Sequence, residues 1–137
     1  MSSVNYPAVL VATVVSYLIG WAWYGGIFKR AWMEAHGLTP ERLEAMKHVR
    51  SPAVAMGGGF VIQLVIAFGL ALLLVWTGYQ TWQHGLAIGV FVWFFFAATV
   101  SLMTALYQAK TMTAVAIDAG YQLVYFALMG AIVGAWR

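Results

Sequence analysis

The chain contains no cysteine and few charged residues, and both absences limit what it can be. Without thiols, it can form no disulfide, thiolate metal site or cysteine nucleophile. Charged residues make up 8% of its 137 residues, against about 25% in a typical soluble domain. Small domains keep a large surface for their volume, so a soluble chain of this length would need far more charge. An ordinary soluble domain is therefore excluded.

Sequence motifs of enzymes are also missing. The chain has no glycine-rich nucleotide loop, no serine nucleophile elbow and no paired carboxylates. Glu44 and His48 are four residues apart, and Glu34 and His36 lie nearby, but neither an HExxH motif nor a third fixed ligand accompanies them. We therefore expect no enzyme activity, no metal and no cofactor.

Apolar residues, in contrast, are abundant and occur in long runs. They make up 64% of the chain, and the mean hydropathy is +0.84. Crossing the apolar core of a bilayer takes about 20 helical residues, and backbone groups in lipid must be bonded within the helix itself. Four runs meet this requirement, at residues 6–28, 52–77, 85–107 and 111–136. The sequence predicts an all-α membrane protein, with a single domain over 1–137 built as a four-helix transmembrane bundle.

The basic residues indicate the orientation of the chain. Residues 29–51 hold five of the seven lysines and arginines, and Lys110 in the third connection is a sixth. Cytoplasmic loops are enriched in such residues, so both connections are expected inside and both termini outside the membrane. The net charge of +3 reflects this distribution, and we expect no nucleic-acid partner.

The first connection also has helical signals. Phe28 and Trp32 are four residues apart, which predicts a short interfacial helix, and Thr39-Pro40-Glu41 is typical of the start of a second helix ending near Lys47. Ser51-Pro52 starts the second span in the same manner. Membrane lipids are the expected partners of this loop. The residues expected to contact lipid headgroups are Lys29, Arg30, Lys47 and Arg50.

Asp118 is the one carboxylate inside a predicted span. Tyr121, Gln122 and Tyr125 follow it at helical spacing and share its face. Two interpretations remain open. Asp118 bonds other helices, through Tyr, Gln or Thr or through a basic residue at the interface, or it binds a proton or cation in a small transporter or channel. The candidate polar site comprises Asp118, Tyr121, Gln122, Tyr125, Gln63 and Tyr17.

Glycine pairs predict close helix packing. Gly85 and Gly89, like Gly130 and Gly134, are four residues apart, and 57–59 is a glycine triplet. Because four spans make a thin bundle, we expect these small-residue faces to be covered in a homo-oligomer.

Two stretches resemble a known family. The first reads Trp23-Tyr24-Gly25-Gly26-Ile27-Phe28 and continues to Trp32, and the second reads Asp118-Ala119-Gly120-Tyr121. With them, nearly the whole chain resembles the bacterial membrane family called domain of unknown function 1761. The resemblance implies a compact four-helix domain of the bacterial inner membrane and no particular activity. The family pattern has Asn or Asp at the position of Asp118, which favours hydrogen bonding as the shared role. The family-motif residues are Trp23, Tyr24, Gly25, Phe28, Trp32 and Gly120.

Three hypotheses for function follow. The leading one is a non-enzymatic, oligomeric membrane protein of uncharacterised role, in which the polar face is closed by hydrogen bonds. The second is a small proton- or cation-coupled transporter or channel that uses Asp118. The third is an accessory subunit that binds membrane proteins or anionic lipid through its basic loop.

Overall fold

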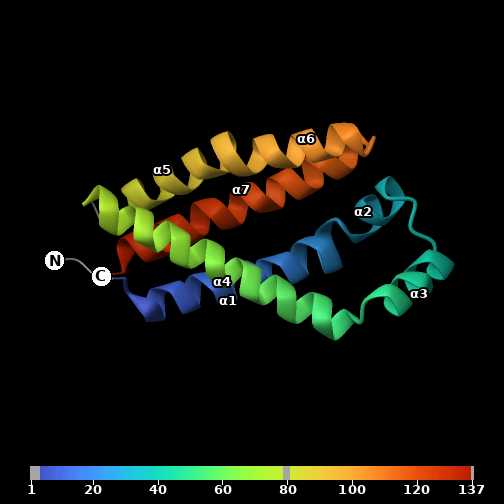
Figure 1. Cartoon of the computed structure of the whole chain (residues 1–137), viewed down its shortest axis with the longest axis horizontal. Helices are drawn as coiled ribbons and strands as arrows, with labels where there is room; N and C mark the ends of the chain where they lie inside the picture. Colours follow the sequence, from blue (N-terminus) through green and yellow to red (C-terminus); the bar gives the residue numbers. More distant parts are fainter. Residues whose placement is uncertain (1–3, 79–80, 137) are drawn as a thin grey trace.

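The structure, a computed structural model of the chain, describes residues 4–78 and 81–136. Throughout this part of the chain the regular structure is helical, and four helical segments are long and apolar enough to cross a membrane (Figure 1). They are Tyr6–Ile27, Pro52–Thr77, Trp82–Tyr107 and Met112–Ala135. The predicted all-α, four-span membrane fold is confirmed.

Two of the four spans contain a π-helical segment that the sequence did not predict. The first span consists of α1 (Tyr6–Ala22) and η1 (Trp23–Ile27), and the third of α5 (Trp82–Val92), η2 (Trp93–Ala98) and α6 (Thr99–Tyr107). The second and fourth spans are the single helices α4 (Pro52–Thr77) and α7 (Met112–Ala135).

The first connection forms two short helices, as predicted. They are α2 (Lys29–Ala35) and α3 (Pro40–Val49), the latter two residues longer than expected. The side chains of Thr39 and Ser51 accept hydrogen bonds from the third amide after them, at 3.2 Å in both cases, and so cap α3 and α4. The third span starts at Trp82, three residues before the predicted position, because Thr81 caps it by accepting from the amide of His84.

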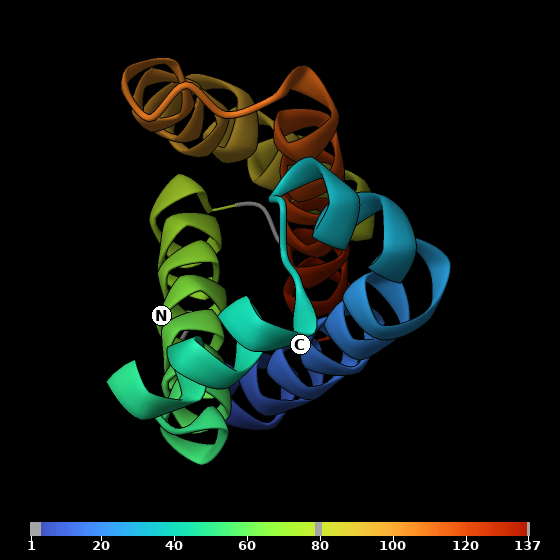
Figure 2. The same cartoon turned by 90° about the vertical axis from the view of Figure 1, so that its right-hand side faces the viewer.

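α1 begins and α7 ends at the same end of the bundle, which we call the terminal end (Figure 1). There the side-chain amide of Asn5 donates to the carbonyl of Trp136 at 3.3 Å. The opposite end, called the loop end, holds α2, α3 and the turn between α6 and α7 (Figure 2). α7 packs against α1, α2, α4, α5 and α6 and is the central helix of the bundle.

α5 and α7 cross with their backbones in direct contact. A Cβ atom on Gly85 would overlap the carbonyl of Gly130, one on Gly89 the carbonyl of Phe126, and one on Gly134 the carbonyl of Thr81. The two glycine pairs predicted to favour an oligomer are therefore used within one chain. Residues 57–59, by contrast, face open space.

The two ends of the bundle differ in how they are filled. Toward the terminal end the core is apolar and tightly packed, with Leu70, Leu74 and Met129 at most 2% exposed. Toward the loop end, α4 runs away from the other long helices, and its residues 52–58 are exposed (Figure 1). The space left between the helices at that end contains the candidate site.

Candidate functional site

The carboxylate of Asp118 is half-buried on α7 and is held by two neutral donors. Its Oδ1 atom accepts a hydrogen bond from the hydroxyl of Tyr24 at 2.7 Å and another from the indole Nε1 of Trp32 at 3.2 Å. Among the residues that the structure describes, Asp118 forms no ion pair and its Oδ2 atom accepts no hydrogen bond. Of the alternative partners considered for Asp118, a tyrosine is present, and no basic side chain in the described part of the chain pairs with it.

The two stretches that resemble the family form a single contact. The indole of Trp23 donates to the carbonyl of Ile117 at 3.0 Å and lies over Gly120, where a Cβ atom would be 3.1 Å from the ring. The Phe28 ring packs against the indole, with ring centroids 4.8 Å apart. Together with Tyr24, these residues join the end of the first span to the second and third turns of α7.

A second tryptophan holds the same turn of α7. Trp93 donates from its indole nitrogen to the carbonyl of Ala119 at 3.2 Å. The carbonyls on both sides of Asp118 are thus bonded by indoles from different spans. Trp23 and Trp93 are each the first residue of a π-helical segment, and such segments are frequent at functional sites. Trp93 is not among the site residues predicted from the sequence. The signal that points to it is that a tryptophan deep in an apolar run needs a partner for its N–H.

The centre of the bundle contains a second hydrogen-bonded group. The amide nitrogen of Gln63 donates to the hydroxyl of Tyr121 at 2.6 Å, and this hydroxyl donates to the carbonyl of Ser16 at 2.8 Å. α4, α7 and α1 are joined by these two bonds. Gln63 Oε1 and Ser16 Oγ are buried without a partner within the described part of the chain.

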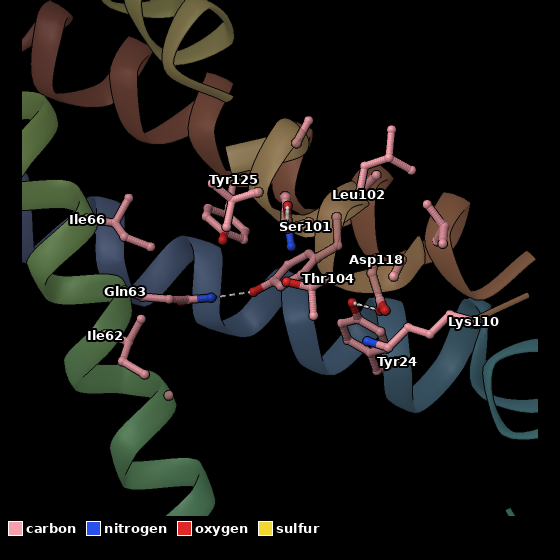
Figure 3. Close-up of a pocket in the computed structure, with 18 residues that line it drawn as sticks. Tyr24, Ile62, Gln63, Ile66, Ser101, Leu102, Thr104, Lys110, Asp118 and Tyr125 are labelled. Carbon is pink, nitrogen blue, oxygen red and sulfur yellow. Dashed lines mark hydrogen bonds between the residues drawn. The ribbon is translucent and has the colours of Figure 1, made fainter. Parts of the chain in front are cut away.

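A cavity of about 440 Å³ lies between α4, α6 and α7 at the loop end, with Tyr24 at its edge (Figure 3). The hydroxyl of Ser101 donates to Gln122 at 3.2 Å on its wall, and Lys110 also lines it. The structure brings five of the six predicted site residues into this lining: Asp118, Tyr121, Gln122, Tyr125 and Gln63.

Tyr17 lies elsewhere. It lines a groove of about 960 Å³ between the first span, α2 and α4, and its hydroxyl donates to the carbonyl of Met56 at 3.0 Å. Gly25 lines the same groove. Cavity and groove meet at four residues that line both, namely Tyr24, Gly59, Gln63 and Tyr121.

The basic residues predicted to contact lipid are exposed at the loop end. Lys47 pairs with Glu44 at 3.4 Å on α3, while Lys29, Arg30 and Arg50 are exposed. Contact with headgroups stays a prediction. Over residues 4–78 and 81–136, no three His, Asp or Glu side chains gather in the way a metal site requires.

Comparison with known proteins gives one finding. No curated protein and no solved structure matches the chain. A family described as protein of unknown function (DUF1761) matches residues 7–134, which includes both halves of the contact around Asp118. The chain, which carries this contact and is matched over nearly its whole length, belongs to the DUF1761 family.

Proposed function

We propose that the chain is a non-enzymatic membrane transport protein that binds a small cationic solute at Asp118. The observation that carries the proposal is a carboxylate at the wall of a cavity with one oxygen bonded by neutral donors and the other available. A carboxylate within a membrane span costs at least about 2 kcal/mol unless it is paired or wetted. A cationic solute in the cavity would supply the missing positive charge.

The rest of the lining suits such a solute. Gln63, Gln122 and Ser101 provide neutral oxygen atoms that can accept hydrogen bonds or coordinate a cation. Lys110 is exposed and lines the same cavity without pairing with Asp118 in the described structure. A bound cation would compete with this lysine for the carboxylate.

The position of the cavity favours a carrier over an open channel. The cavity lies at the loop end, and the apolar core around Leu70, Leu74 and Met129 fills the bundle toward the terminal end. A solute could leave toward the terminal end only after these helices rearrange, as alternating access requires. Since most basic residues lie at the loop end, we place this end in the cytoplasm and both termini outside a bacterial inner membrane.

Self-association and lipid binding remain predictions. Two of the three glycine groups that favoured a homo-oligomer pack against each other within one chain. In the third group, Gly57 and Gly58 remain exposed for a partner copy. Exposed Lys29, Arg30 and Arg50 are compatible with anionic lipid, but nothing in their surroundings distinguishes this role from that of any cytoplasmic loop.

Flux into proteoliposomes tests the proposal. Proton, sodium, potassium and methylammonium gradients would be applied to vesicles containing the native chain, Asp118→Asn or Glu41→Gln. Asn keeps an oxygen for Tyr24 and Trp32 but removes the charge, while Glu41 is an exposed acid on α3 outside the cavity. We expect flux with the native chain and the Glu41 variant, and none with Asp118→Asn. Native traces equal to those of empty vesicles would reject transport of these cations.

A further inference from the structure

We infer that the groove between the first span, α2 and α4 binds the body of a lipophilic organic cation, such as a quaternary ammonium or phosphonium. This inference rests on the proposed function and specifies its substrate class. The groove is about 960 Å³ in volume, which suits an organic molecule and exceeds the need of a bare metal ion. Its lining contributes five aromatic side chains: Tyr17, Trp21, Tyr24, Trp32 and Tyr121.

The aromatic rings form walls in different planes. Tyr24 stands at 75° to Trp32 and at 81° to Tyr121, with ring centroids 5.7 and 5.4 Å away. Tyr17 and Trp21 form a further tilted pair at 5.6 Å. Several ring faces around one space are the arrangement by which proteins bind quaternary ammonium groups, because each face carries partial negative charge.

Asp118 strengthens the attraction of two of these rings for a cation. Tyr24 and Trp32 line the groove and donate their polar hydrogens to the same carboxylate oxygen. A ring whose hydrogen is bonded to an anion becomes richer in electrons, so its face attracts a cation more strongly. The carboxylate itself adds attraction through the rings at short range in a poorly screened environment.

The described lining of the groove carries no positive charge that would compete with a bound cation. Among the described residues that line the groove none is basic, whereas Lys110 lines the cavity. A cation that enters the cavity to reach Asp118 must compete with that lysine, so we expect the bulky body of an organic cation to stay in the groove. In the groove a cation would meet aromatic side chains, Gly25 and Gln63.

The depth of the groove distinguishes a diffusing solute from a lipid headgroup. Gln63 lies near the middle of α4 and Tyr17 near the middle of the first span, so the groove extends to the centre of the membrane. Choline headgroups stay at the bilayer surface and would reach only the end near Trp32 and Gly25. We therefore assign the groove to a freely diffusing lipophilic cation.

Tetraphenylphosphonium and tetraphenylborate provide a test, because they share a shape and carry opposite charges. Binding of each to the purified full chain in detergent would be measured by equilibrium dialysis, with empty micelles subtracted. We expect saturable binding of the phosphonium only. Equal binding of the borate would overturn the inference, because the groove would then select for shape alone.

Variants locate the binding. Trp21→Leu removes one wall, and Trp21 makes no hydrogen bond in the described structure; affinity should fall on the order of tenfold. Trp76→Leu is the matched control, since Trp76 is 73% exposed and outside the groove, and it should bind as the native chain does. Asp118→Asn should also weaken binding, although Asp118 does not line the groove. Unchanged affinity in Trp21→Leu would overturn the inference.

Two further comparisons separate this inference from its alternatives. In nanodiscs, affinity for tetraphenylphosphonium should be the same in phosphatidylglycerol alone and with phosphatidylcholine added. Competition by phosphatidylcholine would assign the groove to lipid headgroups and overturn the inference.

Phosphonium binding without any cation flux would leave the groove as a binding site and reject transport. Flux of small cations without phosphonium binding would support Asp118 in transport and overturn the groove assignment.

Discussion

Gly85 and Gly130 pack backbone against backbone where α5 crosses α7, and a Cβ atom on either would overlap the carbonyl oxygen of the other. The contact is reciprocal, so neither glycine can be enlarged without moving a helix. α7 carries Asp118 and also contacts α1, α4 and α6. Displacement at this crossing would therefore disturb the site as well as the local packing.

Gly85→Ala or Gly130→Ala is expected to destabilise the protein by about 1–3 kcal/mol, the usual cost of forcing an extra methyl into a tight contact. Thermal unfolding in detergent, followed by circular dichroism, would measure this. Gly58→Ala is the control: its Cβ atom would meet open space, and alanine favours a helix by up to about 1 kcal/mol relative to glycine. Equal stability of all three variants would contradict the close crossing.

Asp118→Asn and Asp118→Leu should differ in stability. Asn retains an oxygen that accepts from Tyr24 and Trp32, so its unfolding temperature should stay near that of the native chain. Leu leaves both donors without a partner, and each half-buried donor costs about 1–3 kcal/mol. Thermal unfolding in detergent, followed by circular dichroism, would compare the unfolding temperatures of the two variants. If Asn proves as damaging as Leu, the charge itself holds the helices together.

Tyr121 and Gln63 are expected to be energetically coupled. Tyr121→Phe leaves the amide nitrogen of Gln63 and the carbonyl of Ser16 without their bonds, whereas Gln63→Leu also removes the buried, unpartnered Oε1 atom. Tyr121→Phe should therefore be the more damaging single change. A double-mutant cycle on the free energy of unfolding should give a coupling of about 0.6 kcal/mol, the average for such bonds in membranes. Strict additivity would mean that the bond contributes nothing.

Single cysteines would report the orientation, since the native sequence has none to remove. Glu41 on α3 and Gln83 at the start of α5 are exposed and lie at opposite ends of the bundle. In intact cells, a membrane-impermeant maleimide should label Gln83→Cys and leave Glu41→Cys unlabelled until the membrane is opened. The reverse pattern would invert the orientation proposed from the basic residues.

The fold was predictable because lipid imposes simple rules on sequence. Uncharged runs of about 20 residues fix the spans, and Thr39-Pro40 and Ser51-Pro52 fix helix starts through local hydrogen bonds. The apolar run predicts the third span from residue 85, whereas the helix starts at Trp82, because Thr81 caps it there. Here the necessary information was present in the local sequence.

The site was only partly predictable, because its contacts join distant segments. Helical spacing placed Tyr121, Gln122 and Tyr125 with Asp118, and all four line one cavity. No local pattern shows that Trp32 donates to Asp118 across 86 residues. Tyr17 lines the groove instead, since α4 diverges from the other long helices at the loop end, and the direction of α4 depends on packing throughout the chain.

The π-helical segments also determine where the length of this chain can change. In η1 the amide of Phe28 bonds to the carbonyl of Trp23, five residues back, so such a segment holds one residue more than the equivalent α-helical turn. Deleting one of residues 94–96 would convert η2 into α-helix and keep Gly89 against α7. A deletion within 86–88 would instead rotate the preceding residues by about 100° relative to the rest of the span. Homologues that are one residue shorter should therefore have the deletion within a π-helical segment.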